Sequence, residues 1–151
     1  MCALVSEVSN GAVISAEVTE WASRTPQWAE CVQAELASPL NLKGKIGNRK
    51  LCASSGSIAR FEKTLAQVGG PKERERWFSE WRPQIEVHSD CPCSERVAKL
   101  KLSPAQADAF GVGDELEMTT MTANSRVVRA AEAKGVRLEV ELHRPVWLAG
   151  L

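Results

Sequence analysis

The pattern of hydrophobic and polar positions changes its period near residue 84. Before that point, apolar residues recur every three or four positions, as on the buried face of an amphipathic helix. After it, apolar and polar residues alternate, as in a half-buried strand. We therefore predict an α+β protein with a helix-rich part over residues 1–83 and a strand-rich part over residues 84–151. We expect both to form a single domain covering residues 1–151, since a chain of 151 residues can bury a sufficient core.

The helix-rich part is expected to open with a β-hairpin. Alternation over residues 12–19 predicts a strand, and the dipeptide Asn10-Gly11 before it is a strong hairpin turn. A first helix is predicted over residues 26–37, because Pro26 loses no hydrogen bond in a first helical turn.

Two further helices follow in this part. Serines precede the second helix as caps, and Gly69-Gly70 is expected to end it in a left-handed conformation. The third begins at Pro71 and ends before Pro83, which favours an extended Arg82. The apolar stripe of the second helix consists of Ile58, Phe61, Leu65 and Val68.

The strand-rich part is predicted to be an antiparallel β-meander or a partly closed sheet, packed against two or three helices from the first part. Its clearest strand covers residues 136–142, where every second side chain is aliphatic. A short helix over residues 103–110 is expected to close in a turn at residues 111–114. The other predicted strands are residues 85–87, 98–102, 115–118 and 126–131.

Residues 88–93 have the highest density of side chains that can bind a metal or react, because one imidazole and two thiols lie within six positions. His88, Cys91 and Cys93 supply three of the four ligands that zinc prefers, and Cys52 or Cys31 is a candidate for the fourth. The alternative is an ordinary polar loop, since structural zinc sites usually begin with cysteines two to four residues apart. The same two cysteines can also be read as a redox pair, although a one-residue spacer strains a disulfide.

A second candidate site is the basic segment over residues 42–50. Lys43, Lys45, Arg49 and Lys50 lie among glycines there, which suits a phosphate or a nucleic-acid backbone. The spacing does not match a phosphate-binding loop, and a solvated basic hairpin is the competing interpretation.

Tryptophans supply the third candidate, a partner interface. Trp77 and Trp81 share a helical face beside Arg74 and other charged residues, a composition typical of interface hot spots. Trp147 near the C-terminus can likewise present an apolar segment to a partner. The competing interpretation packs all three indoles into the core.

Charge and cysteine content narrow the classes of function. Nineteen basic and nineteen acidic residues cancel, so the overall electrostatic signature of a nucleic-acid-binding protein is missing. Five cysteines without a recognisable signal peptide favour reduced thiols and a cytoplasmic location. No apolar run approaches the ~20 residues that a transmembrane helix needs, so we expect no membrane partner.

The sequence carries no paired catalytic carboxylates, nucleotide loop or nucleophile motif. We therefore expect a small non-enzymatic binding or assembly protein whose partner is another protein or a second copy of the chain. Chains of this size without a recognisable catalytic motif are frequent among phage and mobile-element accessory proteins, inhibitors and assembly factors. Two alternatives remain open: a zinc-stabilised nucleic-acid-binding module, and a cysteine-dependent enzyme with a reactive thiol at Cys91 or Cys93.

Overall fold

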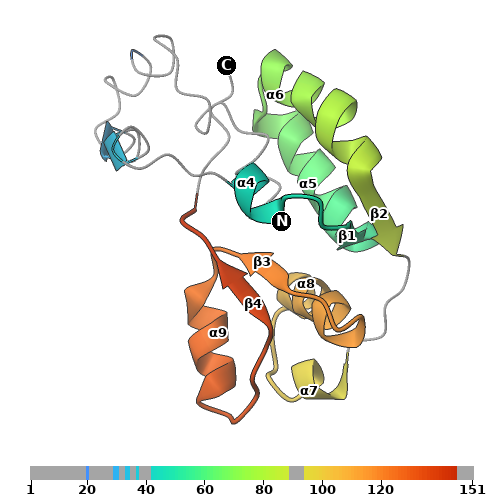
Figure 1. Cartoon of the computed structure of the whole chain (residues 1–151), viewed down its shortest axis with the longest axis vertical. Helices are drawn as coiled ribbons and strands as arrows, with labels where there is room; N and C mark the ends of the chain where they lie inside the picture. Colours follow the sequence, from blue (N-terminus) through green and yellow to red (C-terminus); the bar gives the residue numbers. More distant parts are fainter. Residues whose placement is uncertain are drawn as a thin grey trace.

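The computed structural model describes residues 42–88 and 94–145, together with isolated helical positions at 20, 29–30, 33–34 and 37. Within these residues the fold is α+β, with six α-helices and two small sheets of two parallel strands each. Each sheet belongs to its own group of helices, and the two groups lie one above the other in Figure 1. No helix in the described part of the chain is long and apolar enough to cross a membrane.

The first group is built around the parallel pair β1–β2, in which Cys52 lies beside Glu86 and Ser54 beside His88. Parallel neighbours cannot be joined by a tight turn, so the chain crosses between them through helices. Its elements are α4 (Leu42–Ile46), β1 (Leu51–Ser54), α5 (Ser55–Val68), α6 (Pro71–Arg76), the π-helix η2 (Trp77–Trp81), the 3-10 helix η3 (Arg82–Gln84) and β2 (Ile85–His88).

The β1–β2 pair has one apolar and one polar face. Successive side chains of a strand point to opposite faces. Apolar side chains of both strands pack on the core formed by α5 and η2, which consists of Ile58, Phe61, Leu65, Trp77, Trp81 and Ile85. The intervening positions, Cys52, Ser54, Glu86 and His88, therefore share the opposite face.

The second group has its own core and its own parallel pair, β3–β4. Helix α8 belongs to this group and also contacts β1 and α5, so it joins the two groups. The elements are α7 (Glu95–Ala98), α8 (Pro104–Glu115), β3 (Thr120–Thr122), α9 (Ser125–Glu132) and β4 (Val140–Leu142). Their core consists of Val97, Leu100, Phe110, Val127, Val128, Ala131 and Leu138.

The predicted antiparallel meander is wrong, because the segment predicted as a strand over residues 126–131 is part of helix α9. The side chain of Asn124 accepts a hydrogen bond of 3.2 Å from the backbone N–H of Val127 and caps the helix. Val127, Val128 and Ala131 then fall on one buried helical face. With a helix between them, β3 and β4 pair in parallel instead of forming a hairpin.

Four other predicted features of this part are also wrong. Of the strand predicted over residues 136–142, only Val140–Leu142 form a strand, β4. Residues 98–102 leave α7 through a turn, and residues 115–118 leave α8 with Glu117 at φ 52°. Residues 111–114 continue α8 instead of ending it. Gly113 allows close packing there, because a Cβ at this position would lie 2.0 Å from Oγ1 of Thr120.

The helical predictions fare better. Helix α5 is confirmed, with the Ser54 side chain accepting a 3.0 Å hydrogen bond from the N–H of Ser57. Its end is extended and not left-handed, since Gly69 has φ −79°. Arg82 is helical, not extended, with φ −55°. The predicted hairpin lies outside the described residues, as does most of the helix predicted over residues 26–37, whose few described positions are helical.

Candidate metal centre

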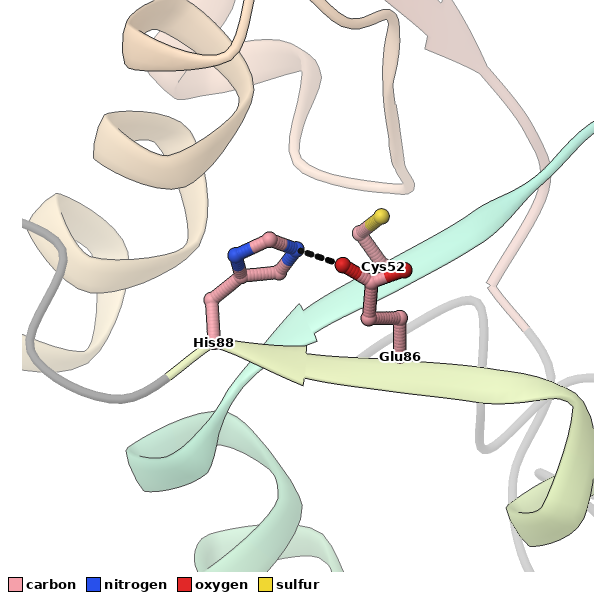
Figure 2. Close-up of side chains that lie close together, drawn as sticks. All are labelled: Cys52, Glu86 and His88. Carbon is pink, nitrogen blue, oxygen red and sulfur yellow. Dashed lines mark ion pairs between the residues drawn. The ribbon is translucent and has the colours of Figure 1, made fainter.

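Cys52, Glu86 and His88 form a compact cluster on the polar face of the β1–β2 pair. One donor atom from each residue lies within 4.8 Å of the other two. The parallel register brings them together: Cys52 is paired with Glu86, and His88 lies two residues further along the same strand. Figure 2 shows that the sulfur and the carboxylate both lie on the Nε2 side of the imidazole ring.

The Nε2 atom of His88 is enclosed and accepts or donates no hydrogen bond within the part of the chain that the structure describes. It lies 3.2 Å from Oε1 of Glu86, close enough for an ion pair when the ring is protonated. The geometry is not that of a hydrogen bond, and the atom has no such partner among the described residues. A buried ring nitrogen normally has a partner. This nitrogen is therefore in a position to coordinate a metal cation.

Glu86 is shared between His88 and Lys50. The Lys50 ammonium lies 2.5 Å from Oε2 of Glu86. This hydrogen bond is the main reason that the pKa of Glu86 is lowered and the pKa of Lys50 is raised. The carboxylate therefore stays ionised at neutral pH, as a metal ligand must be.

The thiol of Cys52 is not activated in this arrangement. Burial, followed by the nearby charge of Glu86, raises the pKa of Cys52 above its ordinary value. A nucleophilic cysteine needs a lowered pKa, and a triad needs its carboxylate and nucleophile on opposite ring nitrogens. The cluster therefore lacks the geometry of a cysteine nucleophile, whereas a divalent cation would stabilise the thiolate directly.

A pocket of about 460 Å³ opens beside the cluster, between the two groups of elements. Cys52 and Ser54 of β1 form one wall, and the facing wall comes from α8 and the segment around Thr120. Arg49 and Lys50 also line it, whereas Trp81 and Ile46 contribute apolar surface. The pocket therefore offers both charged and apolar contacts next to the candidate ligands.

Asp108 of α8 lies at the start of α5 and connects the two groups. Its carboxylate accepts hydrogen bonds from the hydroxyls of Ser54 at 2.6 Å and Ser57 at 3.2 Å, and it pairs with Arg60. Burial raises the pKa of Asp108, but the donated bonds from Ser54, Arg60 and Ser57 outweigh burial and lower it overall. An internal carboxylate thus occupies the helix terminus where an external anion would otherwise be favoured.

The predicted zinc ligands are only partly within the described residues. Cys91 and Cys93 lie outside them, whereas Cys52 and His88 are brought together. The sequence interpretation missed Glu86. The spacing of Glu86 and His88 by two residues in a strand was the available signal, because such residues share a face.

The predicted basic segment is not a hairpin, since residues 42–46 form helix α4. Two of its cations are already paired, Lys45 with Glu141 at 2.7 Å and Lys50 with Glu86. Lys43 lies 6.0 Å from the ring centre of Trp81, at the limit of a cation–π contact. The positive charge of this segment is therefore partly neutralised. Arg49 lines the pocket.

The tryptophans predicted at an interface lie mainly in the core. Trp77 is fully buried and Trp81 is 6% exposed, so the competing interpretation describes them correctly. Arg74 is exposed but donates two hydrogen bonds to the carbonyl of Gly69, at 3.0 and 2.7 Å. Trp147 lies outside the described residues.

The second histidine, His143, follows β4 and is buried away from this cluster. Burial is the main cause that lowers its pKa. Its Nδ1 lies 2.8 Å from the carbonyl oxygen of Arg144, while its Nε2 has no hydrogen-bond partner among the described residues. It contributes no atom to the cluster of Cys52, Glu86 and His88.

The fold and the cluster define an α+β protein with a candidate metal centre on the polar face of a parallel strand pair. Residues 1–150 match a protein family described as "Protein of unknown function (DUF1308)", so the chain belongs to that family. No solved structure matches the chain.

Proposed function

We propose that this chain is a transition-metal-binding protein that holds zinc through Cys52, Glu86 and His88. The observation that carries the proposal is the convergence of a thiol, a carboxylate and an imidazole within 4.8 Å. Thiolate and imidazole ligands together favour zinc over magnesium or calcium. The enclosed Nε2 of His88, which has no hydrogen-bond partner among the described residues, supports the same conclusion.

The number of protein ligands distinguishes a structural zinc site from one that keeps an open coordination position. Zinc bonds of ~2.0–2.3 Å place tetrahedral ligands ~3.3–3.8 Å apart, so the three side chains need to close by about 1 Å. Structural zinc sites have four protein ligands, whereas three protein ligands leave a position for water or a substrate. Because Cys52 also lines the pocket, this position would be reached from the pocket.

The other functions predicted from the sequence have less support. The tryptophan pair behind the protein-binding prediction is buried, and two of the four cations behind the nucleic-acid prediction are ion-paired. The raised pKa of Cys52 argues against that residue as a nucleophile. The metal centre is the function that the geometry supports best.

The test is the zinc content of the full chain, measured by elemental analysis after loading and removal of free metal. We expect about one zinc per chain in the wild type and less than about a tenth of that in Cys52→Ser and His88→Ala, because losing one ligand of three exposes the metal to exchange. The matched control is Cys91→Ser/Cys93→Ser, which alters two other thiols and is expected to retain the metal.

Two results would overturn the proposal. One is a wild-type chain that holds no zinc. The other is a chain that loses zinc in the Cys91→Ser/Cys93→Ser variant but keeps it in Cys52→Ser, since the ligands would then be those of the loop over residues 89–93.

A further inference from the structure

We infer that the pocket beside Cys52 binds a small molecule that joins an apolar body to an oxyanion group, a phosphate or a carboxylate. The oxyanion would lie at Arg49 and Lys50, and the apolar body against Trp81 and Ile46. The part of this inference that concerns the metal rests on the proposed function. The pocket itself does not depend on it.

The size of the pocket suits such a ligand. Its volume of about 460 Å³ lies within the range of ~300–1,000 Å³ that is usual for small-molecule sites. A macromolecular partner would need a larger and flatter surface.

The charges of the lining favour an anion. Among the described residues that line the pocket there are two cations, Arg49 and Lys50, and no carboxylate. The hydroxyl groups of Thr119 and Thr120 add uncharged donors, whereas those of Ser54 and Ser57 already donate to Asp108. An arginine with nearby hydroxyls is well suited to an oxyanion, because its guanidinium donates two parallel hydrogen bonds.

The start of α5 is not the place where this anion would bind. The carboxylate of Asp108 already accepts bonds there from Ser54 and Ser57 and pairs with Arg60. On the other side of the pocket, Lys50 is paired with Glu86, and Arg49 is exposed. The oxyanion therefore belongs at the Arg49 side, while the apolar body fills the space near Trp81.

Lys50 provides a link between the metal and the anion. Its ammonium is held by Glu86, which is also a proposed metal ligand. When a metal takes the carboxylate of Glu86, the attraction between Lys50 and Glu86 weakens, because the carboxylate charge is shared with the cation. Lys50 then becomes available to an oxyanion, so zinc is expected to strengthen anion binding.

The experiment is isothermal titration calorimetry on the full chain with four probes: phenyl phosphate, benzoate, inorganic phosphate and phenol. We expect phenyl phosphate or benzoate to bind about tenfold tighter than inorganic phosphate and phenol, which each lack one part of the ligand. Whichever of phenyl phosphate and benzoate binds tighter identifies the oxyanion. Arg49→Met should weaken that binding about tenfold. The matched control, Arg126→Met, removes an exposed arginine of α9 and should leave binding unchanged.

The outcomes separate this inference from the proposed function. Equal affinity for phenol and phenyl phosphate, or equal effects of Arg49→Met and Arg126→Met, would overturn the anion site. The zinc content of Arg49→Met should equal that of the wild type. If the chain binds no zinc but still binds the probe in a way that depends on Arg49, the anion site is supported and the proposed metal centre is wrong. Affinity unchanged by zinc would overturn the link through Lys50.

Discussion

At the scale of single residues, Asp108 links the two groups of elements. It belongs to α8, yet its carboxylate is bonded by two serines at the start of α5 and by Arg60. Hydrogen bonds to charged groups each contribute about 1.5–3 kcal/mol when they are well formed. The carboxylate is partly exposed, so the lower end of that range applies.

Asp108→Asn should lower the free energy of unfolding at pH 7 by about 1–2 kcal/mol, because the charged acceptor is lost. The folded protein lowers the pKa of Asp108 below its ordinary value of 3.8. The stability that this carboxylate provides is therefore fully present above that value and is lost as pH falls through the lowered folded pKa. Urea unfolding between pH 7 and pH 2.5 should show that the free energy of unfolding falls less in the variant than in the wild type as the pH is lowered.

The control for this prediction is Glu132→Gln, which removes an exposed carboxylate of α9. The decrease in its free energy of unfolding between pH 7 and pH 2.5 should match that of the wild type. An Asp108→Asn protein with the same stability and the same pH profile as the wild type would contradict the assigned role of Asp108.

At the scale of elements, α8 packs closely on β3 because one of its residues has no side chain. A Cβ added to Gly113 would lie 2.0 Å from Oγ1 and 3.3 Å from Cβ of Thr120, and 3.2 Å from the carbonyl oxygen of Met118. Distances this short require the helix or the strand to move. The glycine therefore sets how near α8 lies to β3 and how wide the adjoining pocket is.

Gly113→Ala should lower the free energy of unfolding by about 1–3 kcal/mol, despite the higher helix propensity of alanine, because overpacking outweighs propensity. Thermal and urea unfolding measure the change. Thr120→Ala removes the nearest atom, so the double variant should lose less stability than the sum of the single variants. Strict additivity, or a stabilised Gly113→Ala protein, would contradict the close packing.

The elements differ in how well their sequence signals predicted them. Helix α5 was predictable because its apolar stripe, its serine caps and its Gly-Gly end are all local. Helix α9 was mistaken for a strand because Val127 and Val128 also suit strands, and its helical spacing covers only a few residues. The pairing of Cys52 with Glu86 depends on which distant strands are neighbours and in which register. Local periodicity contains neither fact, so only part of the candidate site could be predicted.

At the scale of the whole molecule, helix α8 joins two separate cores. One core lies under β1 and β2, the other between α8, α9 and β4. Helix α8, Asp108 and the ion pair of Lys45 with Glu141 connect the two groups. The pocket and the candidate metal centre lie at this boundary, which is a common location for ligand sites.

A metal at this boundary would also act on the stability of the whole protein. It would join β1 to β2 through side chains of both strands, and it would bind the folded chain only. Any ligand that binds the folded state alone raises the unfolding temperature according to its affinity and concentration. Zinc should therefore stabilise the wild type and leave Cys52→Ser unchanged.

The proposed metal centre is best tested by a cobalt titration of the full chain followed by absorption spectroscopy. Cobalt(II) takes zinc sites, and a thiolate ligand adds an intense near-ultraviolet charge-transfer band. We expect this band in the wild type and in Cys91→Ser/Cys93→Ser, and its loss in Cys52→Ser. A band that persists in Cys52→Ser, or no band in the wild type, would contradict a metal centre formed by Cys52, Glu86 and His88.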